Sequence, residues 1–332
     1  VTVYKLSLFK KLLKYVAFIT TGSIVSLFIG KRYDYVFGYN ISALTGMMPA
    51  VVVKKLYKKP ITYWAQDLWP DSVYAYGFKK TKWLSYILDK YVNFMYRCVD
   101  GIAISGKGFE SKLKPYCKEG QKFHYLPNWA DDLDMIMEPY KFSDDDKVHF
   151  TFAGNVGKVQ NLENIIKAFS GLDERYSNKA QLNIIGDGSA LEDIKKIAPE
   201  NDSIVFHGKK PRNDMAKYYK GSDFLIVSLI DEPIFSVTVP GKTQTYTAAK
   251  KPILAIINGD VAGIIEENNL GYTAHPSKID EIRSVFVKAI ECDDEQKKEF
   301  TKNCEVLTNT VFNQQNIINR LLDLTLNAEK NN

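Results

Sequence analysis

The sequence lacks the cysteine patterns of a disulfide framework or a metal cluster. Its four cysteines form no CxxC pair and are spread over 332 residues, at Cys98, Cys117, Cys292 and Cys304. This spacing favours a reducing compartment, the cytoplasm. The GxGxxG fingerprint of dinucleotide binding is also missing, which weakens the hypothesis of a nicotinamide dehydrogenase. No Ser-His-Asp arrangement for nucleophilic catalysis can be recognised.

Negative charge is scarce at the start of the chain, where Asp34 is the only acidic residue before Asp67. The net charge of +5 is therefore concentrated in basic residues of the first part: Lys5, Lys10, Lys11, Lys14, Lys31, Arg32, Lys54, Lys55, Lys58, Lys59, Lys79, Lys80 and Lys82. Such a surface attracts phospholipid head groups, a pyrophosphate-linked lipid or nucleic acid. The alternative is an ordinary solvated surface. Of the possible partners we expect a membrane surface and no nucleic acid.

No apolar run clearly reaches the roughly 20 residues that a membrane-spanning helix needs. The longest, Tyr15–Gly30, contains Gly22, Ser23 and Ser26. Two interpretations stay open: a helix in the protein core, which we favour, and a helix lying on a membrane surface between flanking lysines. The second gives the expectation of peripheral attachment to the inner face of the cell membrane. The chain starts at Val1 without a signal-type cleavage site, so we expect its true beginning to be missing.

Length and composition favour two globular domains of roughly 150 residues each. Hydrophobic residues make up 45% and charged residues 25% of the sequence, the balance of a protein that buries cores. Short apolar runs alternate with longer amphipathic runs, which is typical of parallel α/β layers. An aspartate-rich stretch without periodicity, 129–147, predicts a linker. We therefore expect an α/β fold with domains over 1–140 and 141–310 and a C-terminal helix, 311–332, that crosses their junction.

The alternation predicts individual elements. Strands are expected at 35–38, 60–64, 100–105, 123–128, 149–153, 181–185, 203–208, 224–229 and 252–257. Helices are expected at 42–58, 80–97, 161–172, 190–197, 212–220, 243–249, 260–268 and 314–326.

Two predicted strands of the second domain end in glycines and lead directly into helices. The turn Gly154-Asn155-Val156-Gly157 follows the strand 149–153, and Gly186-Asp187-Gly188 follows the strand 181–185. Such turns direct free backbone N–H groups and a helix dipole at an anion. Each alone is as easily an ordinary tight turn. Two at corresponding strand ends predict a nucleotide site at the carboxyl edge of the sheet.

A third segment, Val239–Tyr246, adds cationic chemistry to the second domain. A helix is predicted to begin near Lys242, after Pro240 and Gly241, with the hydroxyl of Thr243 beside it. The lysine supplies a point charge, and the hydroxyl and amide groups supply directional donors, which suits a diphosphate. The alternative is an ordinary capped helix start.

In their order and spacing, four segments resemble the nucleotide-sugar domain of family 4 glycosyltransferases with the GT-B fold: GNVGKVQNLENIIKAF, LNIIGDGSALEDI, IVFHGKKPRNDMAKYYKGSDFLIVSL and PGKTQTYTAAKKPILA. The first half resembles a subgroup that builds O-antigen and capsular polysaccharides, through WAQDLWPDS, YRCVDGIAIS and HYLPNWAD. The resemblance implies two Rossmann-like domains facing each other across a cleft. It also implies a retaining, metal-independent transferase without a further cofactor.

The resemblance further implies the substrates. A hexosyl or N-acetylhexosaminyl group would move from a nucleotide-diphosphate sugar, a UDP-sugar before a GDP-sugar, to a lipid-linked or glycan acceptor of lipopolysaccharide or capsule. By position, Gly154 to Gly157 and Gly186 to Gly188 would face the donor. The backbone of Phe206, His207 and Gly208 would hold the base, although His207 itself is more typical of a structural residue. Gly241, Lys242 and Thr243 would bind phosphate, and Asp67 would lie near the acceptor or the transferred sugar.

The chain departs from the family pattern at several positions. An arginine and a lysine usual in the first loop are replaced by Asn155 and Gln160, and Lys158 would supply the charge. The glutamate that usually holds the ribose aligns with Thr245, so we expect Glu266 to take its role. The family's glycine-rich first strand and loop would lie upstream of this chain. The run Asp144-Asp145-Asp146 has DxD spacing but no preceding strand, and we expect no metal there.

Two further hypotheses remain. A sugar-nucleotide epimerase would share the fold and the ligand, but it needs carboxylates and a histidine converging on the sugar, and the sequence shows no such group. A non-catalytic, transferase-like partner subunit is favoured by the departures at Asn155 and Thr245. Nucleotide binding and donor hydrolysis distinguish these possibilities.

Overall fold

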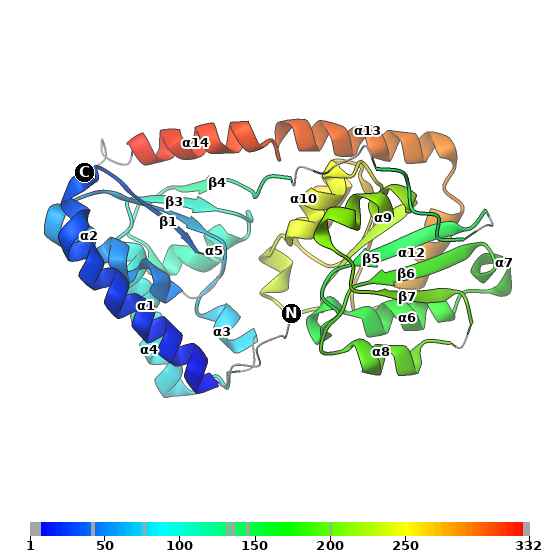
Figure 1. Cartoon of the computed structure of the whole chain (residues 1–332), viewed down its shortest axis with the longest axis horizontal. Coiled ribbons are helices and arrows are strands. Elements are labelled where there is room, and N and C mark those ends of the chain that lie inside the picture. Colours follow the sequence, from blue (N-terminus) through cyan, green and yellow to red (C-terminus); the bar gives the residue numbers. More distant parts are fainter. Residues whose placement is uncertain are drawn as a thin grey trace. The chain divides into compact units, whose positions relative to one another are not determined.

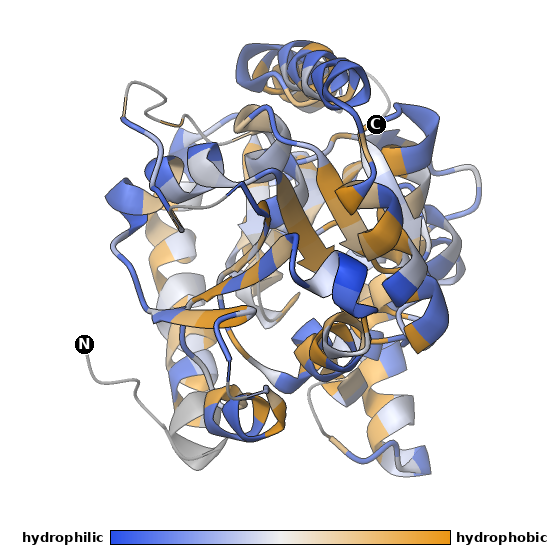
Figure 2. Cartoon of the chain, turned by 90° about the vertical axis from the view of Figure 1, so that its right-hand side faces the viewer, coloured by the Kyte–Doolittle hydropathy of each residue, from blue (hydrophilic) through white to orange (hydrophobic). Residues whose placement is uncertain are grey.

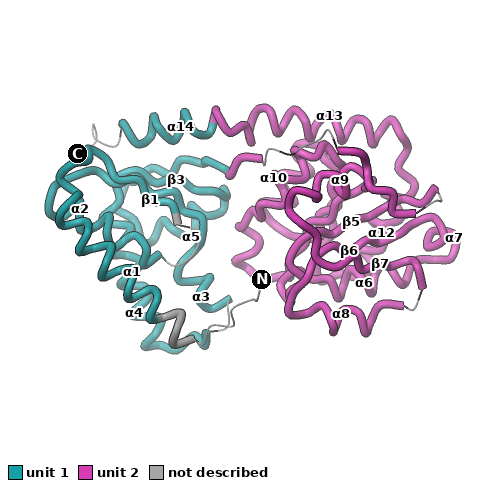
Figure 3. Tube along the Cα trace, in the orientation of Figure 1, with its two compact units in different colours: residues 1–127, 317–332 teal, residues 128–316 magenta. Residues whose placement is uncertain are grey.

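The protein is described by a computed structural model covering residues 8–40, 44–75, 78–130, 133, 137–143, 146–199 and 201–327. The chain forms two compact units (Figure 3), one of Val1–Pro127 with Ile317–Asn332 and one of Asn128–Asn316. The first unit is therefore built from two separate stretches of chain.

The first unit contains a four-stranded parallel sheet in the order β1-β2-β3-β4. The strands are β1 (Val36–Asn40), β2 (Ile61–Ala65), β3 (Gly101–Ile104) and β4 (Phe123–Tyr125), and the helices of the N-terminal stretch are α1 (Leu8–Ile29), α2 (Met48–Tyr57), α3 (Asp71–Ala75), α4 (Lys82–Arg97) and α5 (Phe109–Leu113) (Figure 1). Right-handed crossovers between successive neighbours place α2, α4 and α5 on the same face.

Both faces of the centre of this sheet are covered, which explains why every residue of β2 is buried. Side chains alternate along the strand, so Tyr63 packs edge-on against Tyr96 of α4 while Trp64 points to the other face. There Trp64 donates its Nε1–H to the Leu126 carbonyl at 2.8 Å and packs with Ile317. Ile317 belongs to α14 (Gln314–Asn327), which returns to the first unit.

The second unit contains a six-stranded parallel sheet in the order β10-β9-β8-β5-β6-β7. Its strands are β5 (Val148–Ala153), β6 (Ala180–Ile185), β7 (Ile204–Gly208), β8 (Phe224–Ser228), β9 (Ile253–Ile256) and β10 (Gly271–Ala274). Its helices are α6 (Leu162–Ser170), α7 (Glu174–Ser177), α8 (Leu191–Ile197), α9 (Met215–Gly221), α10 (Gly241–Ala248), α11 (Asp260–Glu267), α12 (Ile279–Ile290) and α13 (Asp294–Thr310). The strand order reverses at β5, and ligands bind at such a switch point, outside the carboxyl ends of the strands.

Two apolar layers hold this sheet. On one face Phe150 stacks on Phe224 and meets Phe286 of α12 edge-on. On the other, Leu225 and Ile253 pack with residues of α9, α10 and α11. Figure 2 shows the strands of this unit largely orange and the helices around them richer in blue. The alternating pattern of the sequence therefore corresponds to a buried sheet between amphipathic helices.

Each predicted strand and helix is present, with shifts at the ends, whereas β10, the long helices α12 and α13 and the short helices α3, α5 and α7 are additional elements. The predicted boundary at 140 differs from the structure, where the second unit begins at Asn128. The physical reason lies in the predicted linker, because Tyr140 donates its N–H to the Lys217 carbonyl and Phe142 packs against His207. The residues Asp144 and Asp145 lie outside the described part of the chain.

Helix α1 is not a core helix, and the interpretation favoured from the sequence is wrong on this point. Its side chains from Leu13 onward are mostly exposed, up to 74% for Phe28, and only Ser26 among them is buried. The segment Leu13–Arg32 is long and apolar enough to cross a membrane, judged by length and composition alone. A core helix or a signal sequence passes the same test. Lys5 lies outside the described residues.

Candidate functional site

The glycine turns after β5 and β6 lie against each other at the carboxyl edge of the second sheet. Gly154 donates its N–H to the Ile185 carbonyl at 2.8 Å, and Gly186 donates to the Gly208 carbonyl at 2.9 Å. The turns have no room for side chains, since a Cβ on Gly186 would lie 1.8 Å from the Gly154 oxygen. Both glycines also have positive φ, +135° and +145°, which only glycine adopts readily. The predicted convergence of these turns is therefore present.

Lys242 lies at the same place. It is the second residue of α10, and a Cβ on Gly154 would meet the Lys242 Cε at 2.8 Å and the Nζ at 3.0 Å. The amine lies 3.6 Å from the centroid of the Phe152 ring. Gly154, Gly186 and Lys242 thus share one location, as the diphosphate hypothesis requires.

The Lys242 amine has an unusual environment for a cation. Its Nζ is buried and has no hydrogen-bond partner among the described residues. Burial lowers the pKa of Lys242 to about 7, because an apolar environment disfavours the charged form. A buried amine of this kind is costly unless an anion is bound to it. The site therefore has the chemistry of a receptor for a negatively charged group.

Two more residues at the start of α10 carry unsatisfied polar atoms. The hydroxyl of Thr243 and both amide atoms of Gln244 are buried without a hydrogen-bond partner in the described structure. Gly241, one residue before Lys242, is exposed, and a Cβ there would meet nothing within 4 Å. The first N–H groups of a helix have no partner within the helix and attract anions. The helix start thus combines an amine with several unused hydrogen-bonding groups.

Gln244 is a residue of this site that the sequence analysis did not single out. The signal available was weak, a glutamine one position after Thr243 in a short helix. Only the structure shows that its amide is fully buried.

The loop from Asn155 to Gln160 closes on itself. The Gln160 Oε1 accepts the Gly157 N–H at 3.0 Å and the Asn155 Nδ2–H at 3.3 Å. The two residues that replace the family's usual bases therefore hold the loop in shape. Lys158 is exposed in the adjoining 3-10 turn, Lys158–Gln160, which leaves its amine available to a ligand.

The remaining residues predicted in the second unit fall into two groups. Asp187 uses its carboxylate locally, because Oδ1 accepts the Gly188 N–H at 2.7 Å. Glu266 lies apart, on the last turn of α11, where its carboxylate accepts a hydrogen bond from Thr273 on β10. Strand β10 is three positions from β5, or about 14 Å at the usual strand spacing. Glu266 therefore does not join the cluster around Gly154.

The predicted base-binding segment ends β7. Phe206 packs against the apolar core, and Gly208 has a φ of +66° with open space on its Cα. The Nε2 of His207 lies 2.8 Å from the Asn183 Oδ1 within a ring cluster. Burial, Lys210 and His149 lower the pKa of His207 to about 4, so the imidazole is neutral and donates to Asn183. Its side chain has a structural role, and the backbone of Phe206 and Gly208 remains the part that could contact a base.

In the first unit, Asp67 lies in the turn between β2 and α3. Its Oδ1 accepts the Leu68 N–H at 2.9 Å, and its Oδ2 accepts the Ser72 hydroxyl at 3.0 Å. Burial raises the pKa of this carboxyl, while the hydrogen bonds from Ser72 and Leu68 oppose the shift. Burial of Asp67 thus favours its protonated form. The residue lies at the carboxyl edge of its sheet, just after β2.

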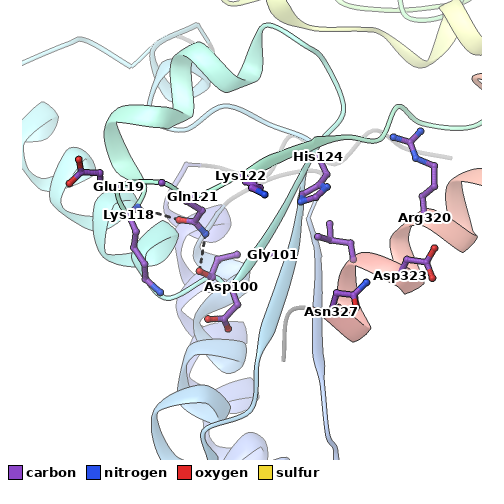
Figure 4. A pocket seen from close by; sticks show the side chains of 13 residues that line it. Asp100, Gly101, Lys118, Glu119, Gln121, Lys122, His124, Arg320, Asp323 and Asn327 are labelled. Atoms are coloured by element: carbon purple, nitrogen blue, oxygen red, sulfur yellow. Dashed lines mark hydrogen bonds between the residues drawn. The ribbon is translucent and has the colours of Figure 1, made fainter. Parts of the chain in front are cut away.

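A separate hollow of about 630 Å³ lies in the first unit at the start of β3 and β4 (Figure 4). Basic side chains of Lys118, Lys122 and Arg320 line it together with acidic ones of Glu119 and Asp323. None of the predicted site residues borders it. Among the described residues, no group of three or more His, Cys, Asp or Glu side chains is placed to hold a metal ion.

The environment of Lys242 predicts a pH dependence of diphosphate binding. The ligand-free amine, with its pKa of about 7, loses its charge as the pH rises above neutrality, whereas a bound diphosphate holds the proton. Binding then takes up a proton, and affinity for UDP should fall by up to about tenfold per pH unit between pH ~7 and ~9. Calorimetry in two buffers of different ionisation enthalpy measures this uptake. A flat affinity profile with no proton uptake would contradict the assignment.

Comparison with protein families places this site in a known context. Residues 137–305, just over half of the chain, match the model of the family described as glycosyl transferases group 1. The probable glycosyltransferase WbjE of Pseudomonas aeruginosa is 27% identical over 223 residues, 64% of this chain and 55% of that protein. The uncharacterized glycosyltransferase MJ1069 of Methanocaldococcus jannaschii is 25% identical over 242 residues, 69% and 59% of the two chains. The chain thus spans somewhat more than half the length of these relatives.

Solved structures share the architecture. HepE of Anabaena in complex with UDP superposes with a TM-score of 0.68 at 12% identity, over 92% of this chain and 81% of that chain. For sucrose-phosphate synthase of Thermosynechococcus elongatus the TM-score is 0.72 at 13% identity, over 93% and 77%. A glycosyltransferase of Rickettsia africae gives 0.71 at 12% identity, over 100% and 85%. Identities this low show the fold alone, and the predicted GT-B fold, with two α/β units, is confirmed.

Proposed function

Since the chain belongs to the group 1 glycosyl transferases, we propose that it moves a sugar from a nucleotide-diphosphate donor to a lipid-linked or glycan acceptor in cell-surface polysaccharide biosynthesis. The observation that carries this proposal is the Lys242 amine, buried beside Gly154 without a hydrogen-bond partner in the described structure. A diphosphate provides the anion that this amine lacks.

We propose that the chain's own residues bind the leaving diphosphate. Lys242 would neutralise charge, and the first N–H groups of α10 would donate to phosphate oxygens. The bare backbone of Gly154 would let the phosphates approach the strand end closely. Stabilisation of the developing negative charge is a principal source of rate enhancement in such a reaction. We propose that these groups act without a metal ion and that the anomeric configuration of the sugar is retained.

Support for a UDP-sugar comes from the fold neighbours, since HepE of Anabaena was solved with UDP, with UDP and glucose, and with UDP-glucose. The backbone of Phe206 and Gly208 would then contact the uracil. For the ribose, which would lack its usual glutamate, Gln244 is a better candidate than Glu266, because its buried amide has unused donors and an unused acceptor.

We propose that the acceptor binds to the first unit. Asp67 would contact the acceptor or the transferred sugar, through a carboxyl whose pKa is raised by burial. The scarcity of acidic residues before Asp67 supports a peripheral position on the inner face of the cell membrane, where a lipid-linked acceptor would be found.

Calorimetry with UDP, UMP, GDP and the corresponding sugars tests the proposal. We expect UDP to bind at least about tenfold more tightly than UMP, because the second phosphate adds a charge-assisted interaction worth about 1.5–3 kcal/mol. One nucleotide sugar should also be hydrolysed slowly. Failure of every nucleotide to bind would overturn the proposal, and binding without hydrolysis or transfer would favour a non-catalytic partner subunit.

A further inference from the structure

Helix α4 presents a row of large apolar side chains to solvent. Trp83 is 72% exposed, Tyr86 64%, and Ile87 and Phe94 just over 40%. Their spacing of three, four and seven residues places them on one side of the helix. We call these four residues the α4 aromatic row. Contiguous exposed apolar groups of this kind mark an interaction surface.

The row is not part of the core packing of α4. The opposite side of the helix, with Leu88, Val92, Met95 and Tyr96, is buried against the first unit. That side anchors the helix and leaves the aromatic row unused by the fold. A polar outer side is the usual arrangement of a surface helix, so the aromatic row requires a different explanation.

Basic residues predominate in the sequence around the row. Residues 72–97 contain Lys79, Lys80, Lys82, Lys90 and Arg97 against a single acid, Asp89. Asp89 is occupied locally, since its carboxylate accepts the Tyr116 hydroxyl at 2.8 Å. The amine of Lys90 lies over the Tyr86 ring, 5.6 Å from its centroid. Aromatic rings interleaved with lysines are the composition of helices that lie in the interface of an anionic bilayer.

Helix α1 carries a second exposed apolar surface of the first unit. It and α4 both contact the 3-10 turn Leu44–Met47. Small residues at four-residue spacing, Gly22 and Ser26 of α1 and Gly30 directly after it, form the side that meets α2: a Cβ on Gly22 would lie 2.8 Å from Pro49. The remaining sides carry exposed apolar residues, and no acid occurs before Asp34.

We infer that the α4 aromatic row, together with the exposed sides of α1, docks the first unit onto an anionic lipid bilayer. The inference rests on the proposed function, because it names the surface that brings the transferase to a lipid-linked acceptor. Trp83, Tyr86 and Phe94 enter the head-group region while the neighbouring lysines contact lipid phosphates. The helices lie in the interface.

Vesicle flotation of the full chain tests this inference, with phosphatidylcholine vesicles that contain or lack phosphatidylglycerol. The double variant Trp83→Ser/Phe94→Ser should bind anionic vesicles at least about tenfold more weakly than the original protein, because two interfacial aromatic side chains are lost. The matched control is Val306→Ser/Leu322→Ser, which removes equally exposed apolar side chains from α13 and α14 and should bind as the original does. In addition, vesicles should shift the tryptophan emission to shorter wavelength, and Trp83→Phe should abolish that shift.

UDP affinity and thermal unfolding of each variant are measured in parallel. Unchanged UDP binding with lost vesicle binding supports the inference and shows that the variant is folded. If the double variant bound anionic vesicles as strongly as the original protein does, the membrane inference would be overturned. The assignment of the donor site would be unaffected. The inference would also be overturned if the original protein did not bind vesicles but formed a dimer that the double variant dissociates. The α4 aromatic row would then be the interface with a second copy of the chain.

Discussion

Replacing Lys242 with methionine should lower the affinity for UDP at least about a hundredfold while leaving the ligand-free protein as stable as before or more stable. The amine is the one charged group that lies beside Gly154 among the contacts described, and its loss removes an interaction of about 3 kcal/mol with the diphosphate. Methionine fills similar volume and removes a buried amine that has no hydrogen-bond partner in the described structure. Calorimetry and thermal unfolding of the same samples measure both effects.

The gain in stability should depend on pH. The pKa of Lys242 is about 7 in the folded protein and near its ordinary value of 10.5 when unfolded. Below pH ~7 the buried amine is charged, and its charge lowers the free energy of unfolding. Between pH ~7 and pH ~10 this destabilisation disappears, because the folded protein then holds the amine in its neutral form. Lys242→Met should therefore stabilise most at low pH. Lys250→Met is the control: Lys250 is exposed, lies just beyond the C-terminal end of the same helix and pairs with Glu305, so its loss should leave UDP binding unchanged. A Lys242→Met protein that binds UDP normally would refute the diphosphate assignment.

Replacing Gly186 with alanine should destabilise the second unit by about 3 kcal/mol or more. The new Cβ would lie 1.8 Å from the Gly154 oxygen, so the two turns must separate, and a φ of +145° adds strain for any residue with a side chain. For a unit of this size the melting temperature should fall by roughly 6 °C or more. Thermal and urea unfolding both report the change.

Gly263→Ala provides the matched control. Gly263 lies within α11, and its new Cβ would meet only the flexible end of Glu267, at 3.8 Å. Alanine at a helical position is favoured over glycine by roughly 0.5–1 kcal/mol, so this variant should melt at the same temperature or higher. Equal stability of the two alanine variants would show that the turns after β5 and β6 do not pack as described.

The sequence predicts the sheets well because their signal is local. Strand β8 (Phe224–Ser228) begins with four consecutive apolar residues and is buried along its whole length, as expected for a central parallel strand. The glycines after β5 and β6 also indicate their role directly, since a close approach of two backbones admits no other residue. By contrast, β10 reads Gly-Tyr-Thr-Ala, a short edge strand whose apolar content is too low to be recognised.

Side-chain environments could not be predicted in this way. The sequence places Lys242 at a helix start, but only the three-dimensional structure shows its amine buried above the Phe152 ring. Glu266 has the right chemistry for a ribose contact. However, α11 begins at the carboxyl edge of the sheet, after β9, and Glu266 lies at the opposite end of that helix. The exposure of Trp83 was equally hidden, because an aromatic residue in an amphipathic helix is read as core.

The two-part construction of the first unit affects how the protein is made. Its core contains Trp64 and Leu126, and the side chain that closes over them, Ile317, comes from the other end of the polypeptide. During translation the ribosome must therefore synthesise the whole second unit before Ile317 can complete the core of the first. At roughly 5–20 residues per second this takes tens of seconds. A nascent chain would meanwhile expose Trp64, so the first unit, although most of it is translated before the second, is the later of the two to mature and the more dependent on chaperones.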